Sequence, residues 1–132
     1  MGLLIDTDVL ILAERQRTQL DFSAWRQYDA AFISAVTASE LLVGVQRAQT
    51  GGQRARRTAF VEGVLASLPA LPFDLEVARV HAQLLAALPR SETVGAHDIQ
   101  IAATALRHGF PVLTKNGKDF RKLDGVTVLD FA

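Results

Sequence analysis

The chain has 132 residues and a mass of 14.3 kDa, which is the size of one domain with one hydrophobic core. Apolar residues make up 49% and charged residues 21% of it, which excludes an intrinsically disordered chain. The absence of cysteine excludes a disulfide scaffold, a thiolate metal site and a cysteine nucleophile. The 14 basic and 14 acidic residues cancel, so bulk charge predicts no particular partner. We expect a single domain over residues 1–132.

The N-terminal segment MGLLIDTDVLILA is apolar, but Asp6 and Asp8 interrupt it and no basic region precedes it. It is also too short to cross a bilayer. We therefore expect neither a targeting segment nor a membrane span. The lack of cysteine fits a cytoplasmic chain.

Short apolar runs alternate with helical patterns along the chain. We expect strands at 3–5 and 31–36, a short or edge strand at 68–73, and strands at 111–114 and 126–129. Between them we expect helices at 9–17, 37–48, 53–67 and 74–88, the last of which is capped by Asp74. A further helix follows a polar loop at 90–96 and ends at Gly109. This alternation predicts an α/β fold of three layers, with a central parallel sheet of four to five strands flanked by helices.

Ligands of open parallel sheets bind beyond the carboxyl ends of the strands. The helix that opens near Asp98 runs antiparallel to the strand it feeds, so its first turn lies at that same edge. Four chain segments thus bring acids or amides to one rim: Asp6 with Asp8, Glu40, Asp98, and Asn116 with Asp119.

Each acid taken alone also has a structural interpretation. Asp6 and Asp8 are typical turn and N-cap residues, and Asp98 is favoured by the helix dipole. The spacing of Thr37 and Glu40 is that of a capping box, in which Glu40 reaches back to the Thr37 amide. Asp119 fits a polar turn. These alternatives stay open for each residue by itself.

The set as a whole favours a metal site. A lone carboxylate at the end of a central strand, as at Asp6, costs several kcal/mol of desolvation unless it has a partner. Several carboxylates on one rim also repel one another and raise one another's pKa values. A hard divalent cation such as Mg²⁺ or Mn²⁺, held by oxygen ligands and waters, relieves both, and it suits phosphoryl transfer.

Three stretches together resemble the PIN-domain family, and specifically VapC-type toxins of prokaryotic toxin–antitoxin pairs. They are LLIDTDVLI, FISAVTASELLVG and HDIQIAATALRHGFPVLTKNGKDF, and the resemblance runs from Leu3 to about Asp130. It implies a Rossmann-like PIN domain with Mg²⁺- or Mn²⁺-dependent ribonuclease activity on RNA. It also implies a cognate VapB-like antitoxin, a homodimer and a cytoplasmic location in a prokaryote.

Matched position by position, the resemblance makes Asp6 and Asp98 ligands of a shared metal ion. It makes Glu40 the second acid of the set and a further metal ligand. The family's T-x-[ND]-x-x-[DE]-F run places its fourth position on Asn116, with Asp119 three residues later, and either one supplies it. The catalytic set is then Asp6, Glu40, Asp98 and Asp119, and the residues expected to support it are Thr7, Asp8, Thr37 and Asn116.

Basic side chains near the rim are candidate contacts for RNA phosphates: Arg47, Lys115 and Lys118. For the basic stretch at 46–57, which includes Arg54, Arg56 and Arg57, we favour a solvated helix face over contact with RNA. His97 stands beside Asp98, but its spacing to other histidines indicates no site.

Three other classes of protein are alternatives to a PIN-domain nuclease. The Asp6-Thr7-Asp8 run mimics the acid pair of a haloacid-dehalogenase phosphatase, although that family requires Thr or Val where Leu10 stands. A response-regulator receiver domain needs an aspartate at the end of the third strand, and Leu71-Pro72-Phe73 supplies none. A non-catalytic α/β binding module, with all of its acids acting as caps, is the third alternative.

Overall fold

The computed structural model describes residues 1–17 and 23–131. Its strands are β1 (Gly2–Ile5), β2 (Ala30–Ser34), β3 (Ala70–Leu71), β4 (Val112–Thr114) and β5 (Val128–Asp130). Its α-helices are α1 (Thr7–Gln16), α2 (Ala35–Gln46), α3 (Gly51–Ser67), α4 (Leu75–Ala87), α5 (Ala96–His108) and α6 (Gly117–Phe120), and a 3₁₀ turn covers Ser23–Trp25.

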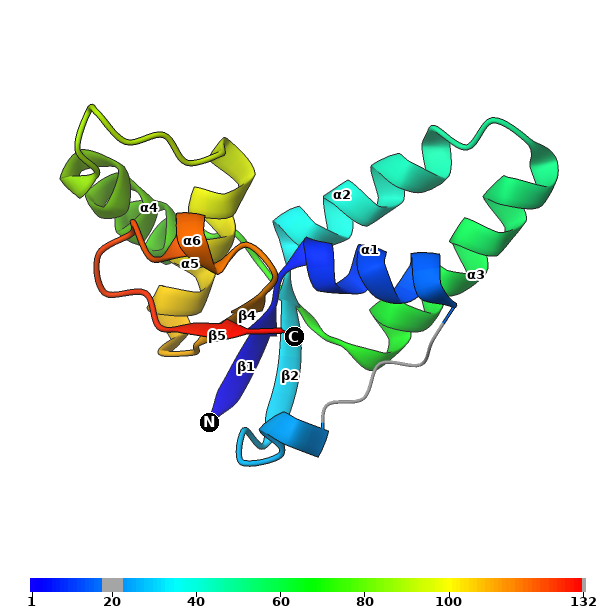
Figure 1. Cartoon of the computed structure of the whole chain (residues 1–132), viewed down its shortest axis with the longest axis horizontal. Coiled ribbons are helices and arrows are strands. Elements are labelled where there is room, and N and C mark those ends of the chain that lie inside the picture. The colour runs from blue at the N-terminus through cyan, green and yellow to red at the C-terminus, as the bar shows by residue number, and fades with distance from the viewer. Residues whose placement is uncertain (18–22, 132) are drawn as a thin grey trace.

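The five strands form one parallel sheet in the order β3-β2-β1-β4-β5. Helices α4 and α5 lie on one side of this sheet, and α1, α2 and α3 lie on the other (Figure 1). The predicted three-layer α/β fold is therefore confirmed. The predicted edge strand is β3, which is only two residues long because Pro69 and Pro72 flank it and neither can donate to a ladder.

Alternating side chains of the central strand β1 feed two hydrophobic cores. Leu4 packs with buried residues of α4 and α5, such as Val77 and Ile101. Leu3 and Ile5 point to the opposite face, where α1, α2 and α3 cover them. With both faces covered, β1 is buried throughout, and the residue that follows it is held deep in the fold.

The start of α2 differs from the prediction. The helix begins at Ala35 rather than Thr37, because the side chain of Ser34 accepts a 3.0 Å hydrogen bond from the amide of Val36 and acts as its N-cap. Thr37 therefore lies inside the first turn, fully buried. The capping box between Thr37 and Glu40 is wrong, because a residue within the helix cannot cap it.

Two other helix ends match the sequence signals, whereas α3 begins at Gly51, two residues before the predicted start. Asp74 caps α4 by accepting a 3.0 Å hydrogen bond from the amide of Val77, as predicted. Gly109 ends α5 with a φ of 72°, the left-handed conformation that favours glycine. Helix α1 begins two residues earlier than predicted because Asp6 caps it. Over residues 1–17 and 23–131, none of the helices has the length and hydropathy that crossing a bilayer requires.

Candidate active site

Asp6 leaves the carboxyl end of β1 and is only 3% exposed. Its Oδ1 accepts a 2.8 Å hydrogen bond from the amide of Thr7, and its Oδ2 accepts a 2.7 Å bond from the hydroxyl of Thr114 at the end of β4. Two neighbouring strands thus hold one carboxylate. Asp6 is therefore both the N-cap of α1 and a fixed acid at the rim of the sheet.

Glu40 projects from α2 toward the start of α1. Its Oε1 accepts a 2.7 Å hydrogen bond from the Thr7 hydroxyl, which lies 2.9 Å from the buried Thr37 hydroxyl. Its Oε2 lies 3.3 Å from Nδ1 of His97 on α5. Glu40 of α2 is therefore in contact with α1 and α5, while the predicted supporting role of Thr7 and Thr37 stays a prediction.

Asp98 lies in the first turn of α5. Its Oδ2 accepts a 3.1 Å hydrogen bond from the side-chain amide of Asn116, and the same amide donates to Oδ2 of Asp119 at 3.2 Å. The start of α5 does lie at the carboxyl end of β4, as the antiparallel course of that helix predicts. Asn116 joins two acids and serves as a donor to them.

Asp119 already has a cationic partner, because the Nζ of Lys122 lies 3.1 Å from its Oδ1. That hydrogen bond lowers the pKa of the Asp119 carboxyl. Lys122 also lies 3.5 Å from Glu92 and donates to the carbonyl of Thr93 at 3.3 Å. Asp119 is therefore less available as a ligand than Asp98, although it lies beside it.

Asp8 occupies the first turn of α1, so it is not the N-cap. Its Oδ1 accepts a 3.2 Å hydrogen bond from the amide of Lys115, and its Oδ2 lies 3.4 Å from the Thr114 hydroxyl. Asp8 therefore ties α1 to the loop after β4, next to Asp6.

The carboxylates of the rim act on one another electrostatically. Burial, followed by the charge of Asp8, raises the pKa of Asp6 to about 8, and Asp98 adds to the rise. Burial also raises the pKa of Asp98, and the charges of Glu40, Asp8 and Asp119 raise it further. Carboxylates from four segments of the chain therefore repel one another at this rim, and a bound cation would relieve that repulsion.

The donor set fits a hard divalent cation that keeps most of its own water. The rim offers carboxylate, hydroxyl and amide oxygens, which are the ligands of Mg²⁺ and Mn²⁺, with the imidazole of His97 beside Glu40. Within the part of the chain that the structure describes, no three acid or histidine side chains converge tightly enough to form a closed cage. One or two carboxylates with several waters is the usual environment of Mg²⁺, and Asp6 with Asp98 fits it.

The candidate RNA contacts lie around the site without forming part of it. Arg47 is exposed just after α2, Lys115 is exposed after β4, and Lys118 is exposed on α6. All three remain predictions. The Nζ of Lys115 lies 6.0 Å from the centre of the Phe131 ring, and the charge of Lys118 contributes to the lowered pKa of Asp119.

Three participants escaped the sequence analysis: Thr114 as a donor to Asp6, His97 as a neighbour of Glu40, and Lys122 as the partner of Asp119. A hydroxyl at the end of a buried strand was a visible signal for Thr114, and adjacency to Asp98 was one for His97. Lys122 gave no comparable signal, because its contacts with Glu92 and Thr93 come from a distant loop.

Comparison with known proteins agrees with this geometry. The PIN domain profile matches residues 3–126. A ribonuclease VapC of Rickettsia bellii is 38% identical over 130 residues, which cover 98% of this chain and 96% of the relative. A tRNA(fMet)-specific endonuclease VapC of Salmonella typhimurium is 33% identical over 100 residues, covering 75% and 74% of the two chains.

Among solved structures, the chain is similar to VapBC-5, a member of the VapBC toxin–antitoxin family from Mycobacterium tuberculosis. The TM-score is 0.77 at 36% identity, with 98% of this chain and 97% of the other covered. The chain therefore belongs to the PIN-domain family and, within it, to the VapC ribonucleases. Nucleases of this kind generally depend on a divalent metal ion.

Proposed function

We propose that this chain is a VapC-type endoribonuclease toxin, in which one PIN domain over residues 1–132 hydrolyses RNA at the acidic rim. The observation that carries the proposal is the meeting of Asp6, Glu40 and Asp98 from three separate segments at the carboxyl edge of the sheet. A phosphatase or receiver domain would not require Glu40 there. Because RNA is the substrate, a cytoplasmic location is part of the proposal.

Asp6 and Asp98 would hold the cation, either Mg²⁺ or Mn²⁺. When bound, the cation would act as a Lewis acid that lowers the pKa of a bound water molecule and neutralises charge on the phosphate. Asn116 keeps the Asp98 carboxylate oriented, and Thr114 does the same for Asp6. These hydrogen bonds fix the two oxygens before substrate arrives, which lowers the cost of organising the site.

Glu40 is the residue placed to orient the attacking water and accept its proton. The Thr7 hydroxyl holds one of its oxygens and leaves the carboxylate half-exposed at the rim. Attack on phosphorus breaks the bond to the 3′ oxygen, which takes up a proton as it leaves. The products are a 5′-phosphate and a 3′-hydroxyl end. Arg47, Lys115 and Lys118 would bind flanking phosphates.

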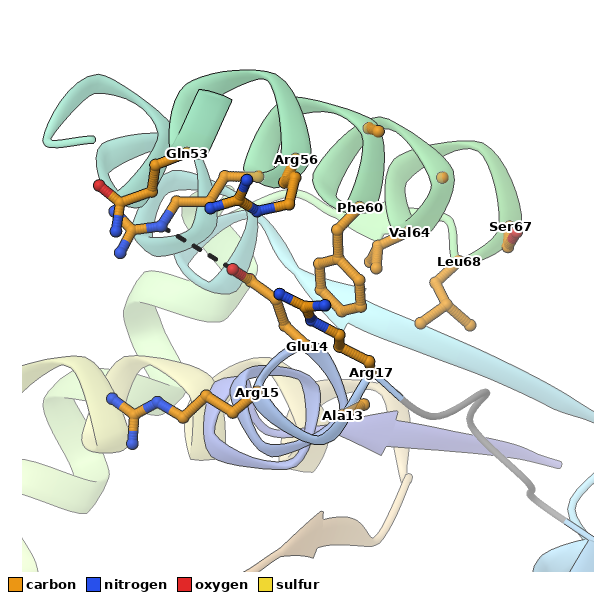
Figure 2. Close-up of a pocket in the computed structure, with 13 residues that line it drawn as sticks. Ala13, Glu14, Arg15, Arg17, Gln53, Arg56, Phe60, Val64, Ser67 and Leu68 are labelled. Atoms are coloured by element: carbon orange, nitrogen blue, oxygen red, sulfur yellow. Dashed lines mark ion pairs between the residues drawn. The ribbon is translucent and has the colours of Figure 1, made fainter. Parts of the chain in front are cut away.

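The proposed partners are a VapB-like antitoxin and a second copy of the chain. A groove of about 910 Å³ between α1 and α3 suits an antitoxin segment (Figure 2). Phe60, Val64 and Leu68 give it an apolar wall, while Arg17 and Arg56 lie at its edges. That combination is complementary to an amphipathic segment that carries acidic side chains.

The test is cleavage of a labelled RNA pool by the purified chain with Mg²⁺, with Mn²⁺ and with EDTA. Metal-dependent cutting with 5′-phosphate ends supports the proposal. Cutting that survives EDTA, or that persists in a folded Asp6→Asn protein, would reject the metal mechanism. Turnover of a generic phosphomonoester instead of RNA would favour the phosphatase alternative.

A further inference from the structure

A second, smaller cavity lies directly beside Glu40. It measures about 210 Å³ and is enclosed by α1, α2 and α3. Glu40 is part of its lining, and so are Glu14 and Arg57, which also line the larger groove. The cavity therefore adjoins both Glu40 and the groove between α1 and α3.

The lining of this cavity is mixed, with charged side chains from Glu14, Arg15, Glu40 and Arg57 and apolar ones from Ile11, Leu41 and Val61. Ile11 on α1 and Leu41 on α2 line it, and Leu41 is buried, whereas Ile11 is 37% exposed. Ile11 is therefore the apolar side chain that the cavity presents to a ligand, beside polar groups that can fix its orientation.

The polar groups of the cavity are held in place. Arg57 donates from Nη1 to the carbonyl of Gly44 at 2.8 Å, and its Nε lies 3.8 Å from Oε1 of Glu14. Figure 2 shows this ion pair bridging α1 and α3 as a dashed line. Glu14 and Arg57 are each about one-third exposed. A carboxylate acceptor and a guanidinium donor thus stand side by side.

Gly44 leaves this cavity open. A Cβ atom built at Gly44 would meet nothing within 4 Å. The carbonyl of Gly44 fixes Arg57, while its missing side chain leaves room one helical turn beyond Glu40. The position of a Cβ atom at residue 44 is therefore open space at the lining of the cavity.

We propose that this cavity holds one unpaired base of the RNA, next to the phosphate that is cut. The proposal rests on the nuclease function proposed above, because Glu40 places the cavity beside the reacting phosphate. Proteins read single-stranded RNA by splaying bases out, packing their faces and hydrogen bonding to their edges. Ile11, which is 37% exposed, would pack on one face of the base. Glu14 and Arg57 would accept from and donate to its edge.

The first step of the test finds the preferred cut site by sequencing the ends that the wild-type chain produces from a random single-stranded RNA pool. Short RNAs with that site then carry an abasic residue at one or the other nucleotide beside the cut. One of the two abasic RNAs should lose roughly 5- to 150-fold in kcat/KM with the wild-type chain, the range that base packing supports.

Gly44→Leu adds a side chain at the lining of the cavity, and Gly63→Leu, on the wall of the larger groove, is its matched control for cleavage by the chain alone. Both glycines lie inside helices, and a Cβ atom at either would meet nothing within 4 Å. Gly44→Leu should cut the intact RNA as slowly as the wild type cuts the abasic one, and should show no further loss on the abasic RNA. Gly63→Leu should behave as the wild type. Glu14→Gln should change the base selected beside the cut.

The outcomes separate the two proposals. If the wild type cuts intact and abasic RNAs equally well, the pocket proposal is wrong and the nuclease function stands. The same conclusion follows if Gly44→Leu keeps the full abasic penalty. If Gly44→Leu fails to fold, the abasic RNAs and the Glu14→Gln variant still show whether the cavity holds a base. If the wild type cuts no RNA, both proposals are rejected.

Discussion

The hydroxyl of Thr114 donates a 2.7 Å hydrogen bond to Oδ2 of Asp6, across 108 residues of sequence. It joins the carboxyl ends of β4 and β1 at the centre of the sheet. The amide of Asn116 donates to the same hydroxyl oxygen at 2.8 Å. One buried threonine therefore orients the proposed metal ligand and also sets the course of the loop that carries Asn116.

Replacing this hydroxyl should affect both stability and metal affinity. We expect Thr114→Val to lower the free energy of unfolding by about 1–3 kcal/mol, because it leaves a buried acceptor on Asp6 and an amide on Asn116 without their partner. Urea denaturation of the metal-free protein measures this loss. Thr114→Ser keeps the hydroxyl and is the matched control. Equal stability of the valine and serine proteins would contradict the assigned role.

The pH dependence of stability follows from the raised pKa of Asp6, about 8 in the folded chain. The folded state binds this proton more tightly than the unfolded state, so the contribution of Asp6 to stability falls as pH rises from about 4 to about 8. The raised pKa of Asp98 acts in the same direction. The midpoint of thermal unfolding of the metal-free protein should therefore fall from about pH 5 to about pH 8.

Asp6→Asn provides the control for that pH effect. The amide carries no charge, so the variant should be more stable than the wild type at about pH 8 and should show a flatter pH profile. Saturating Mg²⁺ should raise the midpoint of the wild type at that pH and leave the variant nearly unchanged. A wild-type midpoint that rises with pH in the absence of metal would contradict the assignment.

Asp98 and Asp119 should differ in how much each contributes to the rate of RNA cleavage. Asp98→Asn removes a proposed ligand, and we expect a loss of at least about 100-fold in cleavage rate. Asp119 is paired with Lys122, so Asp119→Asn should act only through Asn116 and cost roughly tenfold or less. Single-turnover cleavage measures both. Exposed Asp124→Asn is the control, and a larger loss for Asp119 than for Asp98 would reverse the assignment.

The parts of the site that follow from strand and helix order could be predicted from sequence. Asp6 ends a buried strand, and Asp98 opens a helix that must run back to the same edge, so topology alone places both at one rim. Glu40 was less certain, because its spacing to Thr37 equally described a capping box. The position of Ser34 decided between these alternatives, since it caps the helix three residues earlier.

Contacts between helices on one face of the sheet could not be predicted in this way. The pair of Glu14 and Arg57 depends on the crossing of α1 and α3, which no local pattern specifies. Lys122 reaches Glu92 and Thr93 across about thirty residues, and a lysine in a polar loop predicts only solvation. Charge and periodicity fix the layers of the fold, while side-chain pairing depends on packing detail.

The central claim is that Asp6 and Asp98 hold the metal ion that RNA cleavage requires. The most direct test is Mn²⁺ binding, followed by electron paramagnetic resonance, on the wild type, Asp6→Asn and Asp98→Asn, with cleavage measured on the same samples. We predict that both variants stay folded, bind Mn²⁺ at least about tenfold more weakly and lose cleavage in parallel. Unchanged Mn²⁺ affinity in both folded variants would contradict the claim.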